Sequence, residues 1–210
     1  MARNESYLRF NIGAERMATT VGHALAGVDC LLIYRAINPS KNVKLGVLSL
    51  LGMMFFANAP DLDIIVSAFL SNDHLKYHGQ QSHMPFYMLF FSLMMALLLL
   101  KTPLRSFTNY SLGEQSYKTV FSLVFIALLS HSVLDLFTGP LRGLHNSFGT
   151  PILAPFWPDR VSSPITLLIG PHHDTADRFF DWYNVWVVLS ELLIFVPITF
   201  MILLLSKKMR

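Results

Sequence analysis

The sequence predicts an all-α fold: a polytopic membrane bundle of about five helices that carries a metal site at one membrane face. Composition is the first observation behind this prediction. Of the 210 residues, 53% are hydrophobic and only 14% are charged, whereas about 25% are charged in a soluble domain. The second observation is a series of apolar runs close to the roughly 20 residues that a spanning helix needs. The third is a set of histidines and aspartates beside these runs.

The apolar segments expected to cross the membrane are, in chain order, Arg16–Ile37, Leu45–Ala59 (with Ile64–Leu70 as an extension), Met84–Leu100, Thr119–Phe137 and Tyr183–Ser206. The first is interrupted by His23 and by charged residues, but its Gly22 and Gly27 permit the close helix packing that membrane interfaces favour. The second is short and ends at a pair of aspartates, Asp61 and Asp63. The length of the chain suits one membrane-embedded domain that covers residues 1–210.

The three later segments are more uniformly apolar. The third carries no charged residue, the fourth is apolar until His131 and Asp135 near its end, and the last carries only Glu191. The sequence offers no evident partner for that glutamate. Between the fourth and the last segment, repeated prolines prevent a regular helix over Pro151–Pro171. We expect this stretch to lie at the membrane interface and to cover a polar site.

Lysines and arginines are slightly more frequent in one set of loops. This bias predicts a cytoplasmic C-terminus, an N-terminus outside and a polar site on the non-cytoplasmic face, although the opposite orientation stays open. In either orientation alternate loops share a side. The Asp61–His83 connection, the end of Thr119–Phe137 and the Thr138–Asp181 loop are therefore expected to meet at one face, together with His23.

Other features of the chain limit the function classes. A net charge of +3, scattered along the sequence, gives no reason to expect a nucleic-acid partner. Cys30 is the single cysteine, so no intrachain disulfide is possible. No apolar core follows the basic start of the chain, so no cleaved signal peptide is expected and the membrane segments themselves direct insertion.

A set of imidazoles and carboxylates is expected to converge at this face: His23, Asp61, Asp63, His78, His83, His131 and Asp135. These groups are ligands for zinc, iron or manganese, and a bound cation would compensate carboxylates that are costly beside hydrocarbon. His131 and Asp135 stand four positions apart and so share one face of a helix. Asp61 and Asp63 follow Pro60, which indicates a turn that lets both carboxylates point to one pocket. The pattern predicts a metal site.

Two other readings of the same residues remain. In a transporter or channel, the histidines and aspartates would form a cation path through the membrane, but here they gather at one face. In a non-catalytic membrane scaffold, the polar cluster would only hold the helices together. Metal content and ion flux in vesicles distinguish these alternatives.

The order of motifs, His23, then PDLD, HGQQSH, HSVLD and APFWP, resembles the YdjM family of inner-membrane proteins, which are described as metal-dependent hydrolases. The resemblance covers roughly Gly22 to Pro158. It implies a multi-pass protein of the inner membrane and a distant similarity to zinc-dependent phospholipase C and the related zinc nucleases. The implied metal ligands are His23, Asp61, His78, His131 and Asp135.

Further site residues follow from the same resemblance. Asp63 and His83 become further ligands or catalytic partners that accept or return a proton. Gly79 follows His78 where the family usually has an arginine, so Arg142 or Arg160 is expected to bind the phosphate instead. The phospholipase-like His-x-x-x-Glu pair is missing from the sequence, which favours one or two ions, zinc first and manganese or iron as alternatives.

Two more candidate sites carry less weight. His145 is a possible additional ligand. The segment that holds His172, His173, Asp174 and Asp177 has the composition of a metal site, but we interpret it as a solvated loop before the last helix.

The predicted function is a membrane-bound metal-dependent hydrolase of phosphoester bonds in a lipid or lipid-linked substrate. Zinc lowers the pKa of a bound water to about 7, which supplies hydroxide at neutral pH, and a second ion could hold the leaving oxygen. The expected partners are the lipid bilayer and such a substrate. A polar site beneath an apolar, proline-bent cover at the membrane surface suits a lipid whose head group meets the metal.

Overall fold

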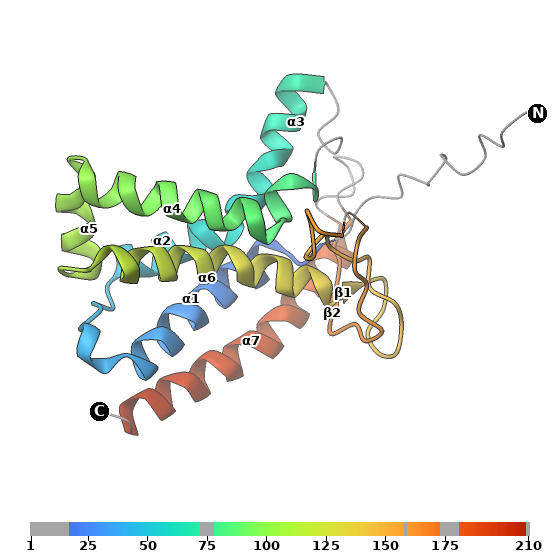
Figure 1. Ribbon diagram of the computed structural model, residues 1–210. Coiled ribbons are helices and arrows are strands. Elements are labelled where there is room, and N and C mark those ends of the chain that lie inside the picture. Colours follow the sequence, from blue (N-terminus) through green and yellow to red (C-terminus); the bar gives the residue numbers. More distant parts are fainter. Residues whose placement is uncertain (1–16, 72–77, 158, 173–180, 209–210) are drawn as a thin grey trace, which may run out of the picture.

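The computed structural model describes residues 17–71, 78–157, 159–172 and 181–208, and this part of the chain is mostly helical (Figure 1). The α-helices are α1 Thr20–Ile37, α2 Val47–Asn58, α3 Asp63–Ser71, α4 Pro85–Lys101, α5 Leu104–Leu112, α6 Tyr117–Leu136 and α7 Trp182–Lys208. Short 3₁₀ helices are η2 Pro39–Lys41, η3 Ala59–Leu62 and η4 Gln81–His83, and a small parallel pair joins β1 Thr138–Gly139 to β2 Leu168–Ile169. The predicted all-α class is confirmed.

The helices match the expected membrane segments. By length and composition, the described residues contain four helices that could cross a bilayer, over Thr20–Ile37, Val47–Ser71, Tyr117–Leu136 and Trp182–Ser206. A fifth is present if α4 and α5, which meet at a bend of 99°, count as one broken span. The prediction of about five membrane helices is therefore confirmed at this level. Pro103 stands just before α5, where its ring cannot continue the preceding helix.

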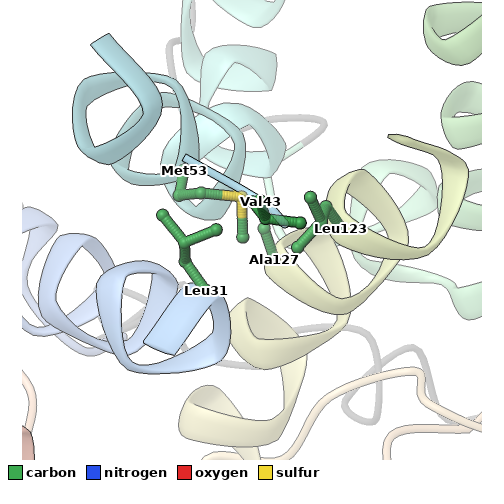
Figure 2. Packing of buried hydrophobic residues seen from close by; sticks show 5 residues of the cluster. All are labelled: Leu31, Val43, Met53, Leu123 and Ala127. Carbon is green, nitrogen blue, oxygen red and sulfur yellow. The ribbon is translucent and has the colours of Figure 1, made fainter. Parts of the chain in front are cut away.

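The bundle is built around α6. This helix contacts α1, α2 and α4, and α7 packs on the outer side of α1 (Figure 1). Figure 2 shows one core cluster, in which Leu31 of α1, Met53 of α2 and Leu123 and Ala127 of α6 point toward one another around Val43. Many leucines and phenylalanines on the outer faces of α4 and α7 are exposed. Such large apolar surfaces are unusual on a soluble monomer and expected for helices in lipid.

Close packing of α1 on α2 depends on Gly27. A Cβ atom at this position would lie 2.5 Å from the Met53 carbonyl oxygen and 2.8 Å from the Ala57 Cβ, so the two backbones would have to separate. We expect Gly27→Ala to lower the free energy of unfolding by about 1–3 kcal/mol, the usual cost of overpacking. Gly52→Ala in α2 is the matched control, because a Cβ there meets no atom within 4 Å. Thermal unfolding in detergent measures both, and equal melting temperatures for the two variants would contradict this view of the interface.

The polar segments gather at one end of the bundle. Pro60 is the second residue of η3, where the chain leaves α2 and enters α3, and α3 projects away from the other helices (Figure 1). The loop with β1 and β2 covers the same end and contains no helix among its described residues, as the prolines of Pro151–Pro171 predict. The start of α4 and the end of α6 also lie at this end. The expected meeting of the three polar connections is therefore observed.

Candidate metal centre

The clustered side chains come from separate elements at this end of the bundle. His23 lies one turn inside α1, Asp61 lies in η3, and His83 ends η4. His131 and Asp135 occupy successive turns near the end of α6, so both point to the same side of that helix. The helix ends thus bring together residues that are more than a hundred positions apart in the sequence.

The first group of possible ligands consists of His23, His131 and Asp135, whose ligand atoms all lie within 4.8 Å of one another. Nε2 of His131 is 3.2 Å from Oδ2 of Asp135, and Nε2 of His23 is 3.4 Å from Oδ1 of the same carboxylate. The His23 and His131 rings stack with their centroids 3.7 Å apart. All three side chains are buried.

The second group consists of Asp61, His78 and His83, again with ligand atoms within 4.8 Å. Oδ1 of Asp61 lies 3.4 Å from Nε2 of His83 and 4.0 Å from Nε2 of His78. The same oxygen lies 3.1 Å from Nε2 of His131, and the His131 and His83 Nε2 atoms are 3.0 Å apart. The two groups therefore adjoin, and Asp61 faces both.

Hydrogen bonds at Nδ1 set the tautomers of three of the histidines. Nδ1 of His131 lies 2.7 Å from the Ala57 carbonyl oxygen, which can only accept, so this nitrogen carries the proton. Nδ1 of His78 lies 2.6 Å from the Asp63 carboxylate, and Nδ1 of His83 lies 2.8 Å from the Ser82 hydroxyl. The neutral tautomer assigned from these contacts leaves an Nε2 lone pair directed at the cluster. This arrangement is typical of histidines that bind a metal.

Several buried polar atoms in the cluster have no hydrogen-bond partner among the described residues. They are Nδ1 and Nε2 of His23, Oδ1 of Asp61 and Oδ2 of Asp135. Oδ1 of Asp61 and Oδ2 of Asp135 have histidine Nε2 atoms close by, but in the assigned tautomers those nitrogens also present lone pairs. A buried polar atom without a partner costs about 1–3 kcal/mol. Converging lone pairs of imidazoles and carboxylates are the donor set that a divalent cation would satisfy, so the residues fit a metal ion.

Comparison with known proteins identifies the family. Residues 17–207 match the YdjM inner membrane protein family. The chain belongs to this family. No curated protein and no solved structure matches the chain significantly. Membership confirms the resemblance drawn from the motifs, and an inner-membrane location follows from the family. The more distant similarity to phospholipase C and zinc nucleases stays a prediction.

In this YdjM-family protein, Asp63 supports the ligands from outside the two groups. Its Oδ1 contacts Nδ1 of His78. Its Oδ2 accepts hydrogen bonds from the Gly79 N–H, at 3.1 Å, and from the Ser82 hydroxyl. Carboxylates in such positions orient ligating histidines.

Complete burial lowers the pKa of the His83 imidazole, against the opposing effect of Asp61, and so favours the neutral ring that binds a metal. The catalytic roles of Asp63 and His83 stay a prediction.

The predicted arginines differ in their surroundings. Arg160 is half-buried, and its guanidinium donates hydrogen bonds to the Gly79 carbonyl, at 2.9 Å, and to the Gly149 carbonyl, at 3.3 Å. Arg160 therefore connects the covering loop, the described part of the chain between α6 and α7, to the segment that carries His78. Arg142 is exposed in the same loop.

The lower-ranked histidines that the structure describes belong to neither ligand group. His145 is exposed and belongs to neither group in the described part of the chain. His172 pairs with Asp181 through an Nδ1–Oδ2 distance of 3.2 Å. His173, Asp174 and Asp177 lie outside the described residues.

The structure also supplies partners that the sequence did not reveal. Glu191 of α7 is fully buried, and its carboxylate accepts hydrogen bonds from the backbone N–H of Thr19, at 2.8 Å, and from the Thr19 hydroxyl. Thr19 caps α1 one turn before His23. A Cβ on Gly22 would lie 2.6 Å from the Glu191 carboxylate, so the glycine permits this approach. The lone charge in the last apolar segment was visible in the sequence, but its partner was not.

Proposed function

We propose that this protein is a membrane-bound metal-dependent hydrolase that cleaves phosphoester bonds in a lipid or lipid-linked substrate. The observation that carries the proposal is the convergence of histidine Nε2 atoms and unpaired carboxylate oxygens in two adjoining groups. His23, His131 and Asp135 would hold one ion, and Asp61, His78 and His83 a second, with Asp61 facing both. Mixed imidazole and carboxylate donors suit zinc first, and also manganese or iron.

A bound divalent cation supplies an acidified water and a positive charge for a phosphoryl oxygen. The chain supplies the ligands and a route for the proton. Ser82 joins two of the predicted catalytic residues, because its hydroxyl lies 2.8 Å from Nδ1 of His83 and donates to the carboxylate of Asp63. His83 can accept a proton at Nε2 only when that nitrogen does not bind the ion. In that role Asp61 and His78 would hold the second ion, and the hydrogen bonds through Ser82 would lead from the buried cluster to the less buried carboxylate of Asp63.

The same geometry argues against the two rival functions. A scaffold cluster would gain stability only if its buried polar atoms were paired. With the histidines in their assigned neutral tautomers, His23, Asp61 and Asp135 keep atoms without hydrogen-bond partners among the described residues. A cation path would need polar groups along the depth of the membrane, whereas the two groups lie together at one end of the bundle. We further propose that this end faces the non-cytoplasmic side.

The proposal assigns phosphate binding to Arg160 before Arg142. We expect Arg160→Gln to lower kcat/KM roughly 10-fold or more, since a hydrogen bond to a charged group contributes about 1.5–3 kcal/mol. Arg142→Gln, at an exposed position of the same loop, is the matched control and should change kcat/KM little. Steady-state kinetics with metal content measured in parallel test the assignment. An equal effect of both variants, or loss of metal in Arg160→Gln, would contradict it.

The direct test of the function uses protein purified without chelator and its measured metal content. The protein is incubated with a panel of lipid phosphoesters in mixed micelles, and release of phosphate or of the lipid alcohol is followed. We expect turnover of at least one lipid by the wild type and none by Asp135→Asn. Full metal occupancy with no cleavage across the panel would overturn the proposal, and movement of ions in vesicles would favour a transporter.

A further inference from the structure

A cavity of about 500 Å³ opens beside the second ligand group. Asp61 and His78 form part of its wall, together with Ile64 at the start of α3. The rest of the wall comes from the start of α1, the end of the covering loop and the first turns of α7. Its volume falls within the roughly 300–1,000 Å³ of small-molecule binding sites. The proposed hydrolase chemistry does not by itself account for this space.

The α7 side of the cavity is apolar, and α7 is one of the helices long and apolar enough to cross a bilayer. Val185, Val188 and Leu189 line it, and their spacing places them on one face of the helix. Val185 and Leu189 remain 43% and 48% exposed, so other side chains do not cover this apolar wall. In Figure 1, α7 is a peripheral helix that contacts α1. A hydrocarbon chain could therefore reach the cavity sideways from the membrane.

The edge of the cavity at the start of α7 is polar and held in place. The N–H of His172 donates to the Asn184 side-chain oxygen at 2.6 Å, and the Asn184 amide donates back to the His172 carbonyl at the same distance. Both residues line the cavity, as does Asp181. These reciprocal bonds fix His172 of the covering loop to α7. The cavity thus joins an apolar wall to two polar regions, one of which belongs to the metal groups.

We propose that this cavity binds one hydrocarbon chain of a phosphate-bearing membrane lipid, with the phosphate at the Asp61–His78 end. The position of the phosphate rests on the proposed function. The binding of the chain rests on the volume and lining of the cavity. Selection of the substrate would then depend on chain length and on the α1 and α7 wall as well as on the metal ligands.

Val188→Trp tests the proposal because the larger side chain would occupy part of the cavity from its α7 side. Leu193→Trp is the matched control, since Leu193 lies on the same helix, is 72% exposed and does not line the cavity. Each protein is released from nanodiscs that contain phosphatidic acid, and retained lipid is counted by native mass spectrometry. We expect the wild type and Leu193→Trp to retain one lipid and Val188→Trp to retain it at least about 10-fold less. If Val188→Trp retains as much lipid as the wild type, the proposal is overturned. If Val188→Trp does not fold, Val185→Trp is tested in its place.

A chain-length series separates this inference from the proposed function. Alkyl phosphates from butyl to hexadecyl are tested as competitors that displace the retained lipid from the cavity. Inorganic phosphate serves as the reference without a hydrocarbon chain. Each buried methylene should strengthen binding about fourfold until the cavity is filled. Affinity that is independent of chain length would overturn the cavity proposal even if short phosphoesters are cleaved. A rising affinity without any cleavage would support the cavity and contradict the hydrolase.

Discussion

Asp61→Asn is expected to remove at least one bound metal ion per protein and to reduce hydrolysis by roughly 100-fold or more. Asn keeps the shape of the side chain but removes its negative charge. The Oδ1 atom of Asp61 lies within 4.0 Å of Nε2 atoms from His78, His83 and His131, so it serves both ligand groups. Losing a supporting residue outside the ligands already costs about 10–100-fold in metal affinity or activity, and a ligand shared by two groups should cost more.

Asp29→Asn is the matched control for this substitution. Asp29 is also a buried aspartate in a membrane helix, but its carboxylate accepts a hydrogen bond from Thr199, at 2.6 Å, and belongs to neither group. Metal content measured by mass spectrometry and hydrolysis measured on the most active lipid should both remain near wild type in Asp29→Asn. If Asp61→Asn keeps its full metal content, the Asp61 carboxylate is not a ligand of either metal ion.

Removing the metal is expected to lower the stability of the wild type by about 3–4 kcal/mol relative to protein with metal at 100–1,000 times its dissociation constant. The ligands come from α1, η3, η4 and α6 and from the turn before η4, so a bound ion would connect segments that are far apart in the sequence. Without it, the imidazole and carboxylate lone pairs of the cluster are left without a cation.

Thermal unfolding in detergent, with chelator and after metal is restored, measures this effect. The melting temperature should fall on chelation, recover with zinc, and change less in Asp61→Asn than in the wild type under the same treatment. A wild-type melting temperature that does not respond to chelator or zinc would show that the groups bind no metal of structural importance.

The sequence predicted the membrane helices well because lipid demands long apolar segments. Met84–Leu100 and Tyr183–Ser206 correspond closely to α4 and α7, and Pro60 marked the break between α2 and η3. The sharp turn between α4 and α5 was not predicted, since local composition does not determine the angle between two consecutive helices. The pairing of β1 with β2 was not predicted either, because the strands have only two residues each and are joined across a long loop.

For the site, the sequence could predict what depends on helical spacing and on the meeting of loops at one face. His131 and Asp135 follow from the first, and the convergence of Asp61 with His78 and His83 follows from the second. The assignment of Nδ1 protons depends on acceptors such as the Ala57 carbonyl, which no side-chain pattern reveals. Membrane orientation and the catalytic roles remain predictions.

The partner of Glu191 also could not be predicted from the sequence. Its partner, Thr19, lies 172 positions earlier in the chain. Only the packing of α7 on α1 brings the two together.

X-ray anomalous scattering from crystals of protein purified without chelator tests the central claim most directly. Data collected at the absorption edge of the metal found by a fluorescence scan should show a peak within about 2.0–2.2 Å of histidine Nε2 and carboxylate oxygen atoms in at least one of the two groups. The absence of any peak there, with the histidines and aspartates hydrogen-bonded only to one another, would contradict the account.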